Sequence, residues 1–257
     1  MSRPRIQLLE VPLSLHTPDG VVGAVSDASA GPGGYIVVCN VHSVMTARRD
    51  SELRKALEES LATTLDGMPL VWGLRALGHH AERLYGQALM ERLLGGVDGR
   101  ITRHYFIGST DLVQQRLLAV IRDRFPRANI VGRWVPPFEP GVPGLPQTVR
   151  EDILAAKPRI IWVGLGCPKQ ERWMARHWRA LAPAVLIGVG AAFEYIAGTK
   201  PTPPLWMRRN GLEWLFRLLT EPRRLAWRYV STNPHFLLRF GIQLVRDRLS
   251  RAADKGA

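Results

Sequence analysis

An aspartate in the segment LDGMP is the strongest candidate for proton transfer in this sequence. Asp66 stands just before an apolar-periodic stretch, residues 68–78, that predicts a helix. A carboxylate at the mouth of an α/β cleft could accept a proton from an attacking hydroxyl group. Asp-Gly is also a common turn signal, so a role in the turn alone is the simpler interpretation of Asp66.

Four further polar residues are candidates for ligand contact, and each has an ordinary structural interpretation. Asn40 ends the buried strand YIVVCN, where it could anchor a ligand and the base or simply cap the next helix. Arg83 could bind an anion or be a surface charge. Gln170 and Glu171 open a predicted helix, where they could face a ligand or only start the helix.

The segment GLGCPKQERW joins a predicted strand, RIIWV, to that helix. A glycine-rich turn before a helix attracts anions, so Gly164 and Gly166 indicate a nucleotide-phosphate site. A dinucleotide fold is excluded, because Lys169 replaces the third glycine of its fingerprint and AVLIG replaces the ribose-binding carboxylate. No DxD or HExxH motif predicts a metal site, which leaves arginine, lysine and backbone N–H groups to neutralise phosphate charge.

Strands and helices alternate along most of the chain, which predicts an α/β fold with a Rossmann-like parallel sheet. The predicted strands are 35–40, 104–109, 128–135, 158–164 and the start of 184–193. The predicted helices are 41–62, in one or two pieces, then 68–78, 110–125, 147–157 and 170–181, with a turn-rich connection at 27–34 and a long loop at 136–146. Ligands of such folds lie beyond the carboxyl ends of the strands, where Asn40, Gly108, Gly164 and Gly190 stand.

The composition indicates which kinds of partner and which cellular compartment suit the protein. The 257 residues carry a net charge of +13, which favours anionic partners such as phosphates, nucleic acid or an acidic lipid surface. The two cysteines, Cys39 and Cys167, are too far apart for a structural zinc motif and fit a reducing compartment. The sequence has no secretory h-region and no apolar stretch of about 20 residues, so we expect a cytosolic protein attached at most to a membrane surface.

The tail differs from the rest, and we expect an α/β core at 1–204 followed by a basic helical appendage at 205–257. From Leu205 onward the pattern is helical only, with 11 basic and 4 acidic residues and thus a net charge of +7. Pro222 suits the first turn of a helix. The segment HFLLRFGIQLVRDRLS predicts an apolar stripe of Leu237, Phe240, Leu244 and Val245 opposite Arg239, Gln243 and Arg246. Such a helix suits either an anionic membrane, touched by Arg239 and Arg246, or a cap on the core.

Seven sequence blocks in order resemble the WecG/TagA/CpsF family of bacterial glycosyltransferases. The blocks are NVHSV, LDGMPLVWGLRALG, ERLYGQALM, YFIGS, GLGCPKQERWM, IGVGAAFEYIAG and GLEWLFRLLTEPRRLAWRY, spanning roughly residues 35–229. The resemblance implies an inverting transfer from a UDP-sugar to a polyprenyl-diphosphate-linked sugar on the cytoplasmic membrane face, with no metal or other cofactor. The implied pathways are teichoic acid linkage, common antigen or exopolysaccharide synthesis.

The resemblance also implies roles for single residues. It makes Asp66 the base and Asn40, Arg83 and Gln170 pocket residues. It assigns the appendage arginines Arg217, Arg224 and Arg228 to substrate binding, where they would stabilise the leaving diphosphate.

Two positions differ from the residues usual in the family, and two other functions remain as alternatives. Val38 replaces a threonine often found in the family, and 202–204 read Thr-Pro-Pro where Arg-Ala-Pro is common, so no role is transferred to these positions. The alternatives are a basic nucleic-acid-binding protein, although no recognition motif of that class is present, and an inactive lipid-binding paralogue.

Overall fold

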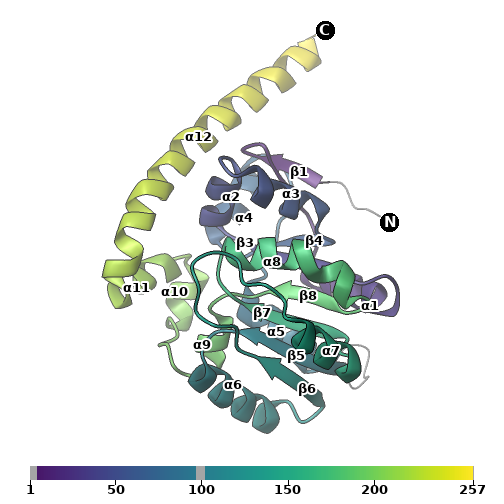
Figure 1. Cartoon of the computed structure of the whole chain (residues 1–257). Helices are drawn as coiled ribbons and strands as arrows, with labels where there is room; N and C mark the ends of the chain where they lie inside the picture. The colour runs from purple at the N-terminus through teal and green to yellow at the C-terminus, as the bar shows by residue number, and fades with distance from the viewer. Residues whose placement is uncertain (1–4, 97–101, 257) are drawn as a thin grey trace.

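A six-stranded sheet forms the centre of the protein, which we describe from a computed structural model covering residues 5–96 and 102–256 (Figure 1). Within these ranges the side chains of residues 205, 209, 224, 228 and 251–256 are not described. The strands are β3 (Gly34–Cys39), β4 (Ala62–Leu65), β5 (Thr102–Gly108), β6 (Ala128–Trp134), β7 (Ile160–Gly164) and β8 (Val185–Gly188). They are all parallel and lie in the order β4-β3-β8-β7-β5-β6. The predicted α/β class with a parallel sheet is confirmed, although the strand order is not the 3-2-1-4-5-6 of dinucleotide-binding domains.

Helices cover both faces of the sheet because its strands are apolar on both sides. In β3, Tyr35, Val37 and Cys39 belong to one buried cluster, whereas Ile36 and Val38 belong to the other. The first cluster is covered by α2 (Val41–Ala47), α3 (Ser51–Glu59), α4 (Met68–Ala76), α7 (Gln147–Ala156), α8 (Lys169–His177) and the short 3-10 helix η1 (Trp178–Leu181). The second is covered by α1 (Pro18–Ala30), α5 (Gly86–Leu94), α6 (Asp111–Arg124) and α9 (Ala192–Ile196).

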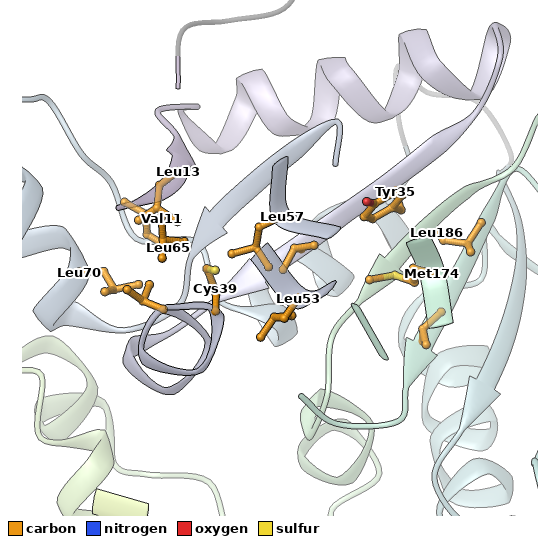
Figure 2. Packing of buried hydrophobic residues seen from close by; sticks show 14 of the residues in the cluster. Val11, Leu13, Tyr35, Cys39, Leu53, Leu57, Leu65, Leu70, Met174 and Leu186 are labelled. Carbon is orange, nitrogen blue, oxygen red and sulfur yellow. The ribbon is translucent and has the colours of Figure 1, made fainter. Parts of the chain in front are cut away.

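An antiparallel hairpin that the sequence analysis did not predict precedes this sheet. It consists of β1 (Arg5–Leu8) and β2 (Val11–Ser14). Leu9 and Glu10 join the two strands with positive φ angles of 52° and 66°, as in a two-residue hairpin turn. Figure 2 shows Val11 and Leu13 of β2 beside Leu65 of β4, so the hairpin closes the core next to the edge strand.

The prediction of a turn-rich connection over 27–34 is wrong for its first half. Helix α1 continues to Ala30, with Ala28 buried against the second cluster, and only residues 31–33 form the turn before β3. Small residues suit the last turn of a helix as well as they suit a loop, which explains the error.

The predicted helix over 41–62 is too long at its C-terminal end and hides a strand. It consists of two helices, because Asp50 accepts a hydrogen bond from the Leu53 N–H (3.0 Å) and starts α3 as a new helix. After α3 the β-branched residues Thr63 and Thr64 extend into β4 and pair with β3. Asp66 therefore follows a strand directly and lies at the carboxyl edge of the sheet.

The tail folds onto the core as three helices, α10 (Leu205–Arg209), α11 (Glu213–Thr220) and α12 (Pro222–Gly256). Helix α12 begins at Pro222 as predicted, runs beside α2, and extends past the core at its C-terminal end (Figure 1). Phe236 is 2% exposed within the first cluster, and Gln243 donates to the carbonyl of Gln7 (3.1 Å) and accepts from the N–H of Leu9 (2.8 Å). These contacts attach α12 to the core, while a domain boundary after residue 204 stays a prediction.

The predicted apolar stripe of α12 is wrong as a single surface. Phe240 and Leu244 pack against the core, but Leu237 and Val245 are exposed. Gln243 faces the hairpin and does not lie on the outward side. The error arises because α12 carries apolar residues on two faces, which a single-stripe analysis merges.

Candidate active site

Asp66 and Asn40 lie side by side because they follow neighbouring parallel strands. The Asp66 N–H donates to the carbonyl oxygen of Cys39 (2.8 Å), which extends the pairing of β3 and β4 by one residue. The Asn40 Oδ1 accepts from the N–H of Ser43 (3.1 Å) and caps α2, so the capping interpretation is confirmed. Asn40 also borders the same two cavities as Asp66, which brings both predicted residues to one site.

The electrostatic surroundings make Asp66 a stronger base than an exposed aspartate. Burial is the largest influence and raises the pKa of its carboxyl group, and the nearby Glu213 raises that pKa further. Arg217, Arg83 and a hydrogen bond from Asn40 act in the opposite direction, and the net pKa is above the ordinary value. A carboxylate with a raised pKa takes up a proton more readily, which suits a general base.

Arg83 connects the Asp66 turn to the appendage. Its Nε donates to the carbonyl oxygen of Asp66 (2.5 Å), and its Nη2 lies 4.0 Å from the Asp66 Oδ1. The same Nη2 forms an ion pair with Glu213 of α11, and the guanidinium group lies 4.7 Å from the ring centroid of Tyr85. Only 15% of the Arg83 side chain is exposed, so Arg83 is not an ordinary surface charge. It links the turn at Asp66 to helix α11.

Arg217 brings a second cation to the site from α11. Its Nε donates to the hydroxyl oxygen of Tyr195 (2.6 Å), and its guanidinium group lies 5.2 Å from the centroid of that ring. Burial would lower the pKa of Arg217, but Tyr195, Asp66 and Tyr229 together hold the pKa above its usual value. The group is therefore a permanent positive charge beside Asp66.

Gln170 joins the two glycine loops at the carboxyl ends of β7 and β8. Its Oε1 accepts from the N–H groups of Gly166 (3.2 Å) and Gly190 (3.1 Å), and its Nε2 donates to the Glu171 Oε1 (2.9 Å). The Gln170 side chain is 3% exposed, so it fixes the distance between the loops and also borders a cavity.

Glu171 is fully buried next to Gln170. Burial raises the pKa of its carboxyl group to about 7, against weaker opposing contributions from its own N–H, from Gln170 and from Cys167. Its second oxygen, Oε2, has no hydrogen-bond partner among the described residues. Glu171 lines neither of the two cavities described below, so the structure places it behind the site.

Two cavities meet at Asp66. A polar cavity of about 190 Å³ lies among the loops after β3, β4, β7 and β8, and includes Gly166, Gln170, Gly190 and Tyr195. A more apolar cavity of about 330 Å³ lies between the start of α4 and helices α11 and α12. The residues that border both cavities are Asn40, His42, Asp66, Glu213 and Arg217. The Asp66 carboxylate thus stands where two separately bound molecules could meet.

The glycines predicted to bind substrate have two different positions. Gly166 and Gly190 line the polar cavity with φ angles of +79° and +54°. Gly108 and Gly164 instead pack against each other at the ends of β5 and β7, where a Cβ on Gly108 would lie 2.5 Å from the carbonyl oxygen of Gly164. They allow two strands to approach closely and line neither of these two cavities.

The remaining predicted residues belong to α12. The side chains of Arg224 and Arg228 lie outside the described part of the structure, so their substrate role stays a prediction. Arg239 and Arg246 are exposed, and the Arg246 Nε lies 3.7 Å from the Asp247 Oδ1.

Several cavity residues were not singled out from the sequence. Glu213, Trp214 and Tyr195 stand inside the blocks GLEW and AFEY, but nothing in those blocks says that they face Asp66. Asn233 carried one signal, because asparagine before a proline is unusual in the middle of a helix. Whether these side chains reach the cavities depends on long-range packing, which a local sequence pattern does not show.

Residues 5–96 and 102–256 contain neither a metal-binding cluster nor a helix that could span a membrane. No group of three or more His, Cys, Asp or Glu in this part of the chain is arranged to hold a metal ion. None of the helices described there combines the length and the apolar character needed to cross a bilayer.

The fold and the two cavities define an α/β protein whose candidate site lies at the carboxyl edge of a parallel sheet, beside the C-terminal helices α11 and α12. Comparison with known proteins narrows this class, because residues 6–251 match the glycosyl transferase WecG/TagA/CpsF family. The chain belongs to this family and is a hexosyltransferase, as the sequence blocks predicted. This membership favours an enzyme over the nucleic-acid-binding alternative.

Two curated relatives carry the same name, N-acetylglucosaminyldiphosphoundecaprenol N-acetyl-beta-D-mannosaminyltransferase. The protein of Bacillus spizizenii is 27% identical over 206 residues, which cover 80% of this chain and 77% of the relative. The protein of Bacillus subtilis is 27% identical over 207 residues, covering 80% and 78%.

Proposed function

We propose that this protein transfers a sugar from a UDP-sugar to a sugar carried on a polyprenyl diphosphate, with inversion and without a metal ion. The names of the two Bacillus relatives support the acceptor, because those enzymes act on N-acetylglucosaminyl-diphosphoundecaprenol. The product would enter a cell-surface polysaccharide of the teichoic acid, common antigen or exopolysaccharide type.

The position of Asp66 between two unlike cavities carries this proposal. The polar cavity offers the cation of Arg217, which suits the diphosphate of a sugar nucleotide, beside two glycine loops that Gln170 holds in place. The apolar cavity suits an acceptor sugar that carries a lipid, because aromatic and aliphatic side chains line it. The acceptor hydroxyl and the anomeric carbon would then meet beside the carboxylate.

The proposed reaction is a single displacement. Asp66 accepts the proton of the acceptor hydroxyl while its oxygen forms a bond to the anomeric carbon. The bond from that carbon to the UDP oxygen breaks on the opposite face, and UDP leaves with the bonding electron pair. Arg217, whose charge lies close enough to Asp66 to lower the pKa of that carboxyl group, stabilises the charge that grows on the diphosphate, as a metal ion does in other enzymes.

The residues on the outward face of α12 support the proposal that this helix contacts the cytoplasmic side of a membrane. The exposed apolar side chains of α12 are Trp227, Val230, Leu237, Leu238, Ile242, Val245 and Leu249, of which Leu237 also borders the apolar cavity. Of these, Leu238, Ile242, Val245 and Leu249 recur at helical spacing and form one stripe away from the core. Arg239 and Arg246 stand next to this stripe, so apolar insertion and attraction to anionic lipid would act together.

One assay tests the proposed reaction. The protein is incubated with a panel of UDP-sugars and farnesyl-diphosphate-linked N-acetylglucosamine, and the products are identified by mass and by the anomeric coupling in NMR. We expect one UDP-sugar to give an inverted disaccharide product, in EDTA as well as without it. Absence of transfer with every donor contradicts the proposal, and activity lost in EDTA but restored by magnesium or manganese contradicts the role given to Arg217.

Asp66→Asn tests the base. The substitution is nearly isosteric, so UDP affinity should be kept while turnover falls by about 10²–10⁴-fold, the usual contribution of a general base. Asp123→Asn, on the exposed side of α6, is the matched control and should behave as wild type. Wild-type turnover of Asp66→Asn, where chemistry limits the rate, would remove Asp66 from the mechanism.

A further inference from the structure

The wall that α12 contributes to the apolar cavity combines apolar and neutral polar groups. Tyr229, Phe236 and Leu237 come from this helix, and Thr232 and Asn233 stand among them. The side chain of Asn233 makes no hydrogen bond to another residue in the described part of the chain. An amide that faces a cavity without a protein partner is available to a ligand.

The local sequence of α12 is unfavourable for a helix at this position. Asparagine has a low helix propensity, and Pro234 disfavours the helical conformation of the residue before it and leaves the Val230 carbonyl without its N–H partner. The stability of α12 therefore does not explain an asparagine at position 233, whereas its place in the wall of the cavity does.

The amide of Asn233 matches a neutral polar group of a ligand. The charged side chains that border the cavity balance one another, with Asp66 and Glu213 against Arg83 and Arg217. Asparagine presents both a hydrogen-bond donor and an acceptor, which matches the N–H and C=O of an amide. Phe236 and Leu237 supply apolar contact for a methyl group.

An aromatic pair from α11 and α12 borders the same cavity. The rings of Trp214 and Tyr229 meet edge to face, with centroids 6.2 Å apart and an angle of 87° between their planes. Trp214 borders the cavity and is partly exposed, so its ring offers an apolar surface to the C–H face of a sugar.

We propose that Asn233 recognises the acetamido group of the acceptor sugar, which lies against Trp214 in the apolar cavity. This inference rests on the proposed function and names the part of the acceptor that the site reads. Asn233 is thus a specificity-determining residue from the appendage, and it acts on the acceptor and not on the donor.

The test compares two acceptors on each variant, farnesyl-diphosphate-linked N-acetylglucosamine and its glucose counterpart. Asn233→Ala should lower kcat/KM for the acetamido acceptor by about ten-fold, the loss expected for one hydrogen bond. With the glucose acceptor kcat/KM should change little, and the KM for the UDP-sugar should not change. Because both acceptors meet the same preparation, their ratio does not depend on how much of the variant is folded.

Asn210→Ala is the control, since Asn210 is exposed and bonds only to the Trp206 carbonyl oxygen (2.8 Å) among the described residues. It should keep the wild-type ratio. An unchanged ratio in Asn233→Ala, or an equal loss with both acceptors, overturns the inference while the proposed function stands. If wild-type protein transfers sugar to neither acceptor, the proposed function fails first and this inference with it.

Discussion

Replacing Gln170 with alanine tests whether one buried amide holds the two glycine loops of the polar cavity. The substitution removes the acceptor of the Gly166 and Gly190 N–H groups. At about 1 kcal/mol for each net hydrogen bond, the free energy of unfolding should fall by about 2 kcal/mol. For a chain of this size, 1 kcal/mol corresponds to about 2–4 °C in Tm, so the expected loss is about 4–8 °C.

The same substitution should weaken UDP binding, because the two loops that border the polar cavity are no longer held at a fixed distance from each other. Thermal unfolding measures the first effect and calorimetric titration with UDP measures the second. Gln147→Ala is the matched control, since Gln147 is exposed and bonds only to Glu151 (2.7 Å) among the described side chains. An unchanged Tm in Gln170→Ala would refute the loop-holding role, and weaker UDP binding at an unchanged Tm would assign Gln170 a direct contact with the nucleotide.

Three further predictions concern charge. Burial raises the pKa of the Glu171 carboxyl group to about 7 from 4.5, so the folded state loses stability as the pH rises from about 4.5 to 7. Glu171→Gln should therefore match the stability of the wild type near pH 5. At pH 8 the variant should be more stable by up to about 3 kcal/mol, measured by urea unfolding. An equal stability difference at both pH values would contradict this. Glu213→Gln removes a charge that raises the pKa of Asp66, so the acidic limb of the kcat/KM profile should move to lower pH, and an unmoved limb would refute the coupling. The double variant Arg239→Glu and Arg246→Glu should sediment less with anionic vesicles, because each lost arginine removes about 1 kcal/mol of binding free energy. Its turnover on a water-soluble acceptor should not change. Vesicle binding equal to that of the wild type would contradict the membrane contact.

The sheet was predictable where a strand is long and apolar on both faces. Segments such as residues 35–40 and 158–164 can only be buried between two layers of helices, and the structure places them there. Strand β4 was missed because it has four residues and follows α3 after a two-residue gap, so its pattern is too short to separate from the helix. The hairpin at residues 5–14 was missed because Leu9 and Glu10 are not the residues that usually mark such a turn.

Part of the site was predictable for a similar reason. Asn40 and Asp66 follow strands, and parallel strands bring their carboxyl ends to one edge, which is why both residues border the same cavities. The ion pair between Arg83 and Glu213 spans 130 residues and depends on how α11 packs, which no local pattern encodes. The bonds of Gln170 to two loops were not predicted, because its position at a helix start does not show them, and its contact with a ligand stays a prediction.

The packing of the tail has a consequence for how the site can work. Arg217 and Glu213 influence the pKa of Asp66 from α11, and the contacts that hold α11 and α12 in place include Arg83 and the buried Phe236. The pKa of Asp66 therefore depends on α11 and α12 being docked on the core. Because the outward face of α12 is apolar, the surface that we propose for membrane contact and the charges that influence Asp66 belong to consecutive helices of the chain. A substitution that releases α11 or Phe236 from the core should then be measurable at Asp66, as a change in the pH dependence of turnover rather than in binding alone.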